Sequence, residues 1–405
     1  MANWFLIYKI RGISVCVLSA LSLILVCYFA DNLAISLLTG PSVGQKIEQI
    51  KEVTGDAREA STDGYLFVDV AFDKELVPIY DVEFPLGEID ITHRGKLTEF
   101  LSQLEGQHKY VMLDVLLDKN YKSEHDSALV ETILHTPRIA VARTADSRLI
   151  DSRLDSLSGF TDYSTHIYET NFVKYEFITE NGNSLPYRAF LDENPEDKLY
   201  SFGPFYFQGD NLAWKSLTLR FPIKMWGNTK SSSGPAAANE SSTFTVHPLG
   251  GEILFAALDV PTLVKNKIVV IGDFSDVDIH DTYLGKVSGP VINTNALEAL
   301  RNGELKIPWW LIVFLFFLYS GFTWFAIRGI PHTQFTDKWI FSLRPKSKFW
   351  RYLLSFVGYS FVLSVISGII YLIAGVDINV LIPSLWFTFL HGIRKWFLQK
   401  PQNSL

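Results

Sequence analysis

Acidic and basic residues are sorted along this chain, and the sorting constrains its topology more than any other feature. Residues 31–306 carry 25 Lys and Arg against 41 Asp and Glu, a net charge of −16, whereas the rest of the chain carries 11 against 2. The basic residues of that remainder cluster beside four long apolar runs. Because Lys and Arg beside membrane spans stay cytoplasmic, we expect the acidic block on the other side of the membrane.

The four apolar runs predict four transmembrane helices, one before the acidic block and three after it. A hydrocarbon core takes about 20 apolar residues to cross, and the runs at 13–30, 307–327 and 352–375 fit that length. The run at 378–393 is shorter. We expect it to cross as well, with flanking basic residues reaching the headgroups; a re-entrant or interfacial helix is the alternative.

Four crossings place both termini in the cytoplasm. The N-terminal segment 1–12, the basic loop 328–351 and the tail 394–405 then share the cytoplasmic side. Residues 31–306 form the extracytoplasmic domain, and the bilayer is the first expected partner.

The first run has a cleaved signal peptide as its alternative interpretation. No clear small-residue cleavage site follows it before Asp31, so we favour an uncleaved anchor. Cys16 and Cys27, the only cysteines, lie inside this run. The exported domain therefore cannot use disulfides, thiolate nucleophiles or Cys-ligated metals.

Alternating strand and helix patterns predict an α/β exported domain. Short apolar segments indicate strands, and apolar residues at helical spacing indicate helices between them. We expect a mixed, largely parallel sheet, since strand–helix–strand order implies parallel strands joined by right-handed crossovers. The predicted strands are 64–72, 108–117, 138–142 and 267–271, and the predicted helices are 93–107, 126–135, 251–258 and 290–301.

Residues 160–248 interrupt this alternation. They are rich in aromatic, Gly, Asn and Pro residues, and we expect an irregular, partly antiparallel β-rich insertion. Within it, Ser231–Ser242 has five serines and no bulky apolar residue, which is typical of a mobile loop.

Several segments in order resemble one known domain family. They are the strand end and helix start Ile89–Leu97, the apolar strand Tyr110–Val115, the helix start Asp126–Leu129, and Ile268–Gly272 followed by Asp281-Thr282, Gly289-Pro290 and Asn295-Ala296. Together they resemble the CHASE type 2 domain, an extracytoplasmic sensory domain associated with cyclases and histidine kinases. Three helices after the domain also match the arrangement usual in that family.

The resemblance covers residues 40–306 and implies a multi-pass protein of the bacterial inner membrane with a periplasmic sensory domain. Family members often carry an output module after the last helix, whereas only 394–405 follows here. We therefore expect signalling through a separate kinase, cyclase or regulator, or through a second copy of the chain. The resemblance supplies no catalytic residue and no cofactor.

Acidic residues crowd the segment after the predicted strand 267–271. Ligands collect at the carboxyl ends of parallel strands, so Asp278, His280 and Asp281 are candidate ligand-binding residues, together with Asp273 and Asp276 nearby. A Ca²⁺ or transition-metal site is an alternative, although the spacing fits no EF-hand loop. The remaining interpretation is that these acidic residues only form turns and cap helices, and the neighbouring glycines favour it.

Asp114 and Arg94 complete the set of candidate ligand-binding residues. Asp114 lies within the predicted apolar strand 108–117, either at the functional edge of that strand or paired in the interior. An unpaired buried carboxylate would be costly, and Arg94 or Arg138 could be its partner. Arg94 with Lys96 could instead bind an anion at a helix start.

No enzyme signature appears in the sequence. It lacks a Gly-x-Ser-x-Gly elbow, a His-Glu-x-x-His motif and a phosphate-binding loop, so we expect that the protein is not an enzyme. The exported domain carries a net negative charge and is therefore poorly suited to binding nucleic acid. The leading hypothesis is a sensor of an unidentified small molecule. The alternative is a scaffold subunit that docks an envelope protein, and a metal-dependent hydrolase is a minor third.

Overall fold

The computed structural model describes residues 2–32, 43–54, 62–81, 84–162, 174–223, 245–256, 258–275, 278–282, 285–328 and 348–398. The loop Ser231–Ser242, most of the loop 328–351, Asp276 and residues 399–405 lie outside that set. The chain forms two compact units. One combines Glu52–Leu199 with Lys215–Leu305, and the other combines Met1–Lys51, Tyr200–Trp214 and Lys306–Leu405.

A six-stranded sheet forms the centre of the first unit. Its strand order is β12–β1–β13–β4–β5–β6. Every pair in it is parallel, so the expected mixed sheet is corrected, and the antiparallel pairs lie in small separate sheets. The strands are β1 (Tyr65–Asp69), β4 (Tyr110–Asp114), β5 (Ile139–Arg143), β6 (Ser158–Phe160), β12 (Val246–Pro248) and β13 (Ile268–Gly272).

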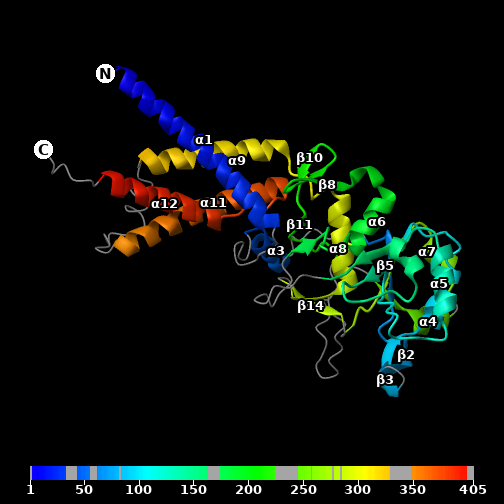
Figure 1. The fold of residues 1–405 in the computed structure, drawn as a ribbon. Coiled ribbons are helices and arrows are strands. Elements are labelled where there is room, and N and C mark those ends of the chain that lie inside the picture. Colours follow the sequence, from blue (N-terminus) through cyan, green and yellow to red (C-terminus); the bar gives the residue numbers. More distant parts are fainter. Residues whose placement is uncertain are drawn as a thin grey trace. The chain divides into compact units, whose positions relative to one another are not determined.

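Helices cover both faces of this sheet, as Figure 1 shows. The helices α4 (Arg94–Ser102) and α5 (Asp126–His135) lie on one face, with the π-helical turn η3 (Leu249–Leu254). The helices α6 (Leu185–Glu193) and α8 (Gly289–Arg301) pack together on the other face. Strands enclosed on both faces are apolar at almost every position, and β1 and β13 are indeed buried throughout.

Three of the four expected helices form, two of them with changed ends. The helix at 126–135 forms as predicted, and α8 begins one residue earlier, at Gly289. α4 ends at Ser102 because Glu105 and Gly106 adopt positive φ angles of 49° and 70°, which a helix cannot continue through. The predicted helix 251–258 is replaced by η3 and the short helix α7 (Val260–Val264).

The segment 160–248 is more ordered than an irregular insertion. Its flanks join the main sheet as β6 and β12, and α6 packs on β4, β5 and β6. Elsewhere it is antiparallel as expected, in the pair of β7 (Tyr175–Glu176) with β11 (Ser216–Leu217) and in the three-stranded sheet β10–β9–β8. The last three strands are β8 (Leu199–Phe202), β9 (Phe205–Gln208) and β10 (Asn211–Ala213).

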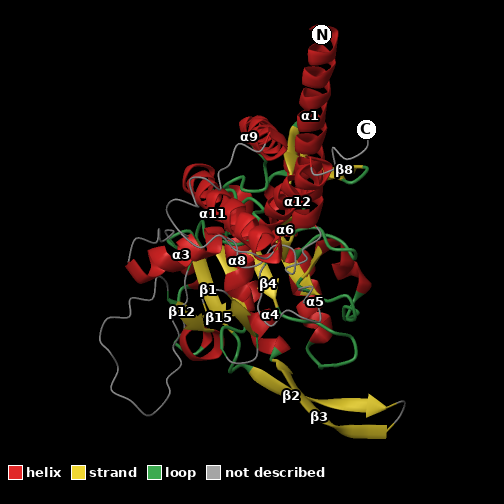
Figure 2. Ribbon diagram, turned by 90° about the vertical axis from the view of Figure 1, so that its left-hand side faces the viewer, coloured by secondary structure: helices red, strands yellow, loops and turns green. Residues whose placement is uncertain are grey.

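A two-stranded ribbon extends from the first unit. The strands β2 (Lys74–Asp81) and β3 (Phe84–Thr92) pair with each other in antiparallel register and stand away from the main sheet (Figure 2). The ribbon leads directly into α4, whose N-cap residue His93 accepts a hydrogen bond from the Lys96 backbone N–H.

The second unit holds the apolar helices. They are α1 (Ala2–Asn32), α9 (Trp309–Arg328), α11 (Lys348–Ala374) and α12 (Leu381–Leu398). Among the described residues three are long and apolar enough to cross a membrane, at Gly12–Asn32, Trp309–Ile327 and Tyr352–Ala374, while Leu381–Ile393 is shorter. The expectation of three spans at 13–30, 307–327 and 352–375 is therefore confirmed as membrane-compatible helices, and the fourth stays a prediction.

Within this second unit the strands of Tyr200–Trp214 are attached to the first helix. The Tyr28 hydroxyl donates to the Ala213 carbonyl at 3.1 Å and accepts from the Tyr206 N–H at 2.8 Å. The Tyr28 ring stacks on Trp214 with centroids 5.4 Å apart. Ala213 also bridges to Lys306, just before α9. Sequence patterns gave no indication of this attachment.

Candidate functional site

The carboxyl ends of three adjacent strands bring acidic residues to one edge of the sheet. In the register of the sheet, Asp69 at the end of β1 lies beside Gly272 of β13, which lies beside Asp114 of β4. The chain leaves β13 as Asp273, and Asp278 and His280 follow in the strand β14 region (β14, Ile279–Thr282). The sequence therefore predicted this edge correctly as a place where ionisable groups gather.

Asp114 is held by a chain of hydrogen bonds through α8. Asn293 Nδ2 donates to Asp114 Oδ2 at 2.7 Å, and the Tyr175 hydroxyl donates to Asn293 Oδ1 at 2.7 Å. Asn293 and Tyr175 are buried. Both ends of the Asn293 amide are thus used in connecting the end of β4 to β7.

Asp278 and His280 complete the cluster. His280 Nε2 lies 2.9 Å from Asp278 Oδ1, and both side chains are about one third exposed. Asp278 also accepts the Gly289 N–H at its main-chain oxygen, at 2.8 Å. A Cβ on Gly289 would lie 2.0 Å from Asp278 Oδ2, so only glycine allows the carboxylate to approach the start of α8 this closely.

A second glycine lets α8 approach the sheet. A Cβ on Gly272 would lie 2.4 Å from Pro290 Cγ and 3.3 Å from Asp114 Cβ. Gly272 and Gly289 together bring the first turn of α8 against the ends of β13 and β4. This close approach is what places Asn293 within reach of Asp114.

The surroundings of Asp114 favour its protonated form. Desolvation by the surrounding protein, followed by the negative charge of Asp278, raises the pKa of Asp114 to about 7, against partial opposition from the Asn293 hydrogen bond and from His280. Near neutral pH the site can therefore take up or release a proton when a charged or hydrogen-bonding ligand arrives.

A neighbouring carboxylate on the same edge stabilises a loop. Asp69 Oδ1 accepts the backbone N–H groups of Ala71 at 2.9 Å and Phe274 at 3.2 Å. Burial raises the pKa of Asp69. Asp273 faces Lys74, with 3.4 Å between Oδ2 and Nζ. These two carboxylates hold the segments that follow β1 and β13.

The other sequence candidates lie elsewhere. Arg94 is buried and forms an ion pair with Asp126, so it is not the partner of Asp114. Lys96 is 2.6 Å from Asp73. Arg138 donates to the His108 carbonyl. The expected pairing of Asp114 with Arg94 or Arg138 is therefore wrong, since each arginine has a nearer acceptor.

Asp281 also stands apart from the cluster. It is exposed, and the β14–β15 register places it opposite Lys286 (β15, Gly285–Ser288). Successive side chains of a strand point to opposite faces, so Asp281 and His280 diverge. Among the described residues no three His, Cys, Asp or Glu side chains are arranged to hold a metal ion.

The sequence analysis missed Asn293 and Tyr175. A signal existed for the first: Asn293, Thr294 and Asn295 lie in a helix whose residues are buried on all sides up to Leu297. Polar side chains in such a helix need internal partners. No comparable pattern in the sequence indicated Tyr175, which lies in the insertion 160–248.

Comparisons of the chain with protein-family models, with curated proteins and with solved structures find no match.

Proposed function

We propose that this protein is a membrane-anchored extracytoplasmic sensor of the kind that its resemblance to the CHASE type 2 domain implies. The residues 31–306 face the periplasm, the flanking helices hold them in the bacterial inner membrane, and both termini are cytoplasmic. The charge distribution supports this orientation, because the basic residues outside the acidic block flank the apolar runs.

The observation that carries the proposal is the cluster of Asp114, Asp278 and His280 around the start of α8. Two carboxylates and an imidazole at the carboxyl edge of a parallel sheet form a place where a small molecule with N–H or O–H donors would bind. Asp278 and His280 are partly exposed, so a ligand can reach them. The raised pKa of Asp114 is typical of functional sites.

The chain connectivity offers a route for the signal. Asp114 is bonded to Asn293 in α8, and residues 302–308 are all that separate the end of α8 from α9. A ligand that draws Asp278 away from Gly289 would release the first turn of α8. Helix α8 would then change its position on the sheet and move α9, which follows it in the chain. A separate kinase, cyclase or regulator, or a second copy of the chain, would respond to the change at α9. The ligand selects between the two states by its differential affinity for them.

A thermal-shift screen of the full chain in lipid nanodiscs tests the proposal. The screen uses amino acids, small organic amines and carboxylic acids, and divalent cations. We expect at least one compound to raise the unfolding midpoint of the wild type and of Asp146→Asn, an exposed control, but not of Asp278→Asn. Stabilisation that is equal in all three proteins would contradict a site at this cluster.

The scaffold alternative predicts a different result from the same material. The domain would then respond to no compound, and envelope proteins would co-purify with wild type and Asp278→Asn alike. No observation of the described residues favours this alternative over the sensor.

A further inference from the structure

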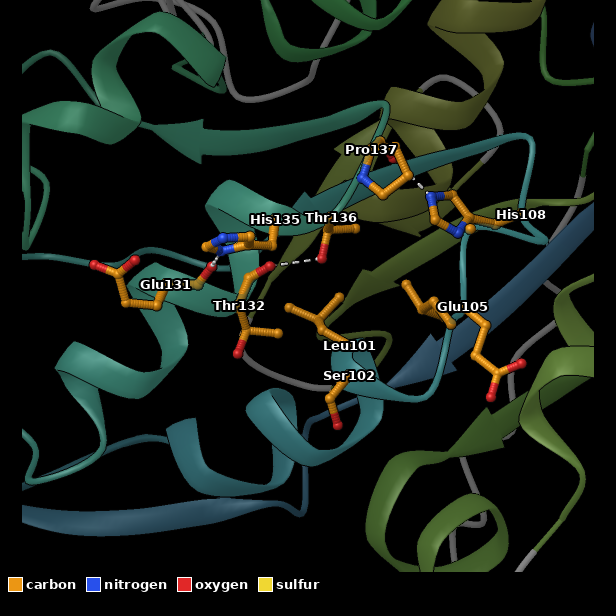
Figure 3. A pocket seen from close by; sticks show the side chains of 11 residues that line it. Leu101, Ser102, Glu105, His108, Glu131, Thr132, His135, Thr136 and Pro137 are labelled. Atoms are coloured by element: carbon orange, nitrogen blue, oxygen red, sulfur yellow. Dashed lines mark hydrogen bonds between the residues drawn. The ribbon is translucent and has the colours of Figure 1, made fainter.

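A cavity lies at the opposite edge of the sheet from Asp114. It has a volume of about 540 Å³ and is formed where α4 and α5 end, next to the starts of β4 and β5 (Figure 3). Leu101, Leu104 and Pro137 give it apolar walls, and its polar lining includes Glu105, Glu131 and no Lys or Arg. It shares no residue with the cluster around Asp114.

The hydroxyl groups that line this cavity can only accept hydrogen bonds from a ligand. Ser102 Oγ donates to the Glu99 carbonyl at 2.7 Å, and Thr132 Oγ1 donates to the Ala128 carbonyl at 2.9 Å. Thr136 Oγ1 donates to the Thr132 carbonyl at 2.8 Å. Because a hydroxyl has one proton, each oxygen keeps only its lone pairs for the cavity.

The histidines follow the same rule. His108 Nε2 is 2.7 Å from the Pro137 carbonyl and must donate to it, which leaves Nδ1 as an acceptor in the neutral ring. Burial lowers the pKa of His108, so the ring stays neutral at neutral pH. His135 Nδ1 is 2.7 Å from the Glu131 carbonyl and donates to it, so Nε2 is the ring nitrogen left for a ligand.

His108 is the observation that points to a ligand. The residue is 1% exposed, and its Nδ1 has no hydrogen-bond partner in the described part of the chain. Figure 3 shows one ring nitrogen turned to Pro137 and the other turned away from it, toward the side where Glu105 lies. A buried polar atom without a partner is costly, and a donor supplied by a ligand would remove that cost.

Two helix ends and the Glu105 carboxylate favour a cation in the cavity. The carboxyl-terminal ends of α4 and α5 carry partial negative charge. Glu131 is paired with Arg153 at 2.8 Å, while Glu105 has no ion pair among the residues that the structure describes. Arg138 lies near His108 but directs its guanidinium to the His108 and Gly106 carbonyls.

We infer that this cavity binds a linear alkyl polyamine. Ammonium groups supply N–H donors to a lining whose polar side chains are acceptors, and the methylene segments between them match the leucine and proline walls. The inference does not depend on the proposed function of the Asp114 cluster.

Isothermal titration of the full chain in nanodiscs with spermidine tests the inference. We expect saturable binding to the wild type. Loss of one charge-assisted contact should weaken it about tenfold in Glu105→Gln. A smaller loss, about threefold to tenfold, is expected in Thr136→Val. Tetramethylammonium, a cation without N–H donors, should not compete.

Two matched controls guard against general attraction to an acidic protein. Glu99→Gln removes a charge from the exposed side of α4, and Thr98→Val removes a hydroxyl that also donates within α4, to the Arg94 carbonyl. Neither residue lines the cavity. Spermidine affinity should stay within about twofold of the wild type in both. Absence of saturable binding to the wild type, or equal weakening by Glu99→Gln and Glu105→Gln, would overturn the inference.

Discussion

Asn293 and Asp114 are 179 residues apart in the sequence, yet the Asn293 amide donates to the Asp114 carboxylate at 2.7 Å. The same amide accepts from Tyr175 through its oxygen. Asn293 thereby connects the end of a central strand, the first turns of α8 and the strand β7. An aspartate of the same shape would be no substitute, because in its ionised form it has no donor for Asp114 and would add a negative charge beside it.

Replacing Asn293 by leucine should destabilise the first unit. The change removes the hydrogen bonds that Asn293 makes with the Tyr175 hydroxyl and with the Asp114 carboxylate, which costs about 1–3 kcal/mol of unfolding free energy for buried groups. Denaturation of the full chain in nanodiscs measures the effect. Asn120→Leu, the same change in an exposed loop, is the control and should lie within about 0.5 kcal/mol of the wild type.

The stability of the wild type should fall as pH rises through the titration of Asp114. Its pKa is about 7 in the folded chain against an ordinary 3.8, so the folded state holds a proton that the unfolded state has lost between these values. By linkage, stability declines with rising pH in that window and is level outside it. Relative to Asp114→Asn, which cannot titrate, the wild type should lose on the order of 4 kcal/mol across this window. A difference between the two proteins that is flat from pH 4 to pH 8 would contradict the raised pKa.

The Arg94–Asp126 ion pair should be far more important for stability than the exposed pairs. Arg94 has only 2% of its side chain exposed, and Arg153 has 53%. Arg94→Met should cost about 3–5 kcal/mol, because it leaves Asp126 without its partner. Arg153→Met should cost far less than Arg94→Met, because Arg153 and its partner Glu131 are both exposed to solvent. Chemical denaturation compares the two variants, and Arg94→Met combined with Asp126→Leu should recover part of the loss.

Local pattern predicted the elements of this fold better than their partners. Apolar strands and helical spacing identified β4, α5 and β13, because burial on both faces leaves a strong signal in a short window. The sequence left open whether Asp114 lies at the edge of its strand or is paired in the interior, and the structure places it at the end of β4. Its neighbours could not be predicted, since Asn293 and Asp278 reach it only through the sheet order and through the missing side chains of Gly272 and Gly289.

Helix α12 should cross the membrane completely. Its apolar part, Leu381–Ile393, rises about 20 Å at 1.5 Å per residue. With the extension to Leu398 the helix reaches about 27 Å, which is close to the roughly 30 Å hydrocarbon core. The helix continues five residues beyond the predicted run at 378–393, and the basic residues Arg394 and Lys395 lie in that extension, where cytoplasmic charges belong. Reporter fusions after Ser342 and after Leu405 should therefore give cytoplasmic signals, whereas a fusion after Ser232 should give a periplasmic one. A chain shortened to end at Gly375 before the reporter is the matched control and should report the periplasm. If the fusions after Gly375 and Leu405 report the same compartment, α12 lies along the membrane surface, and the basic tail is not cytoplasmic.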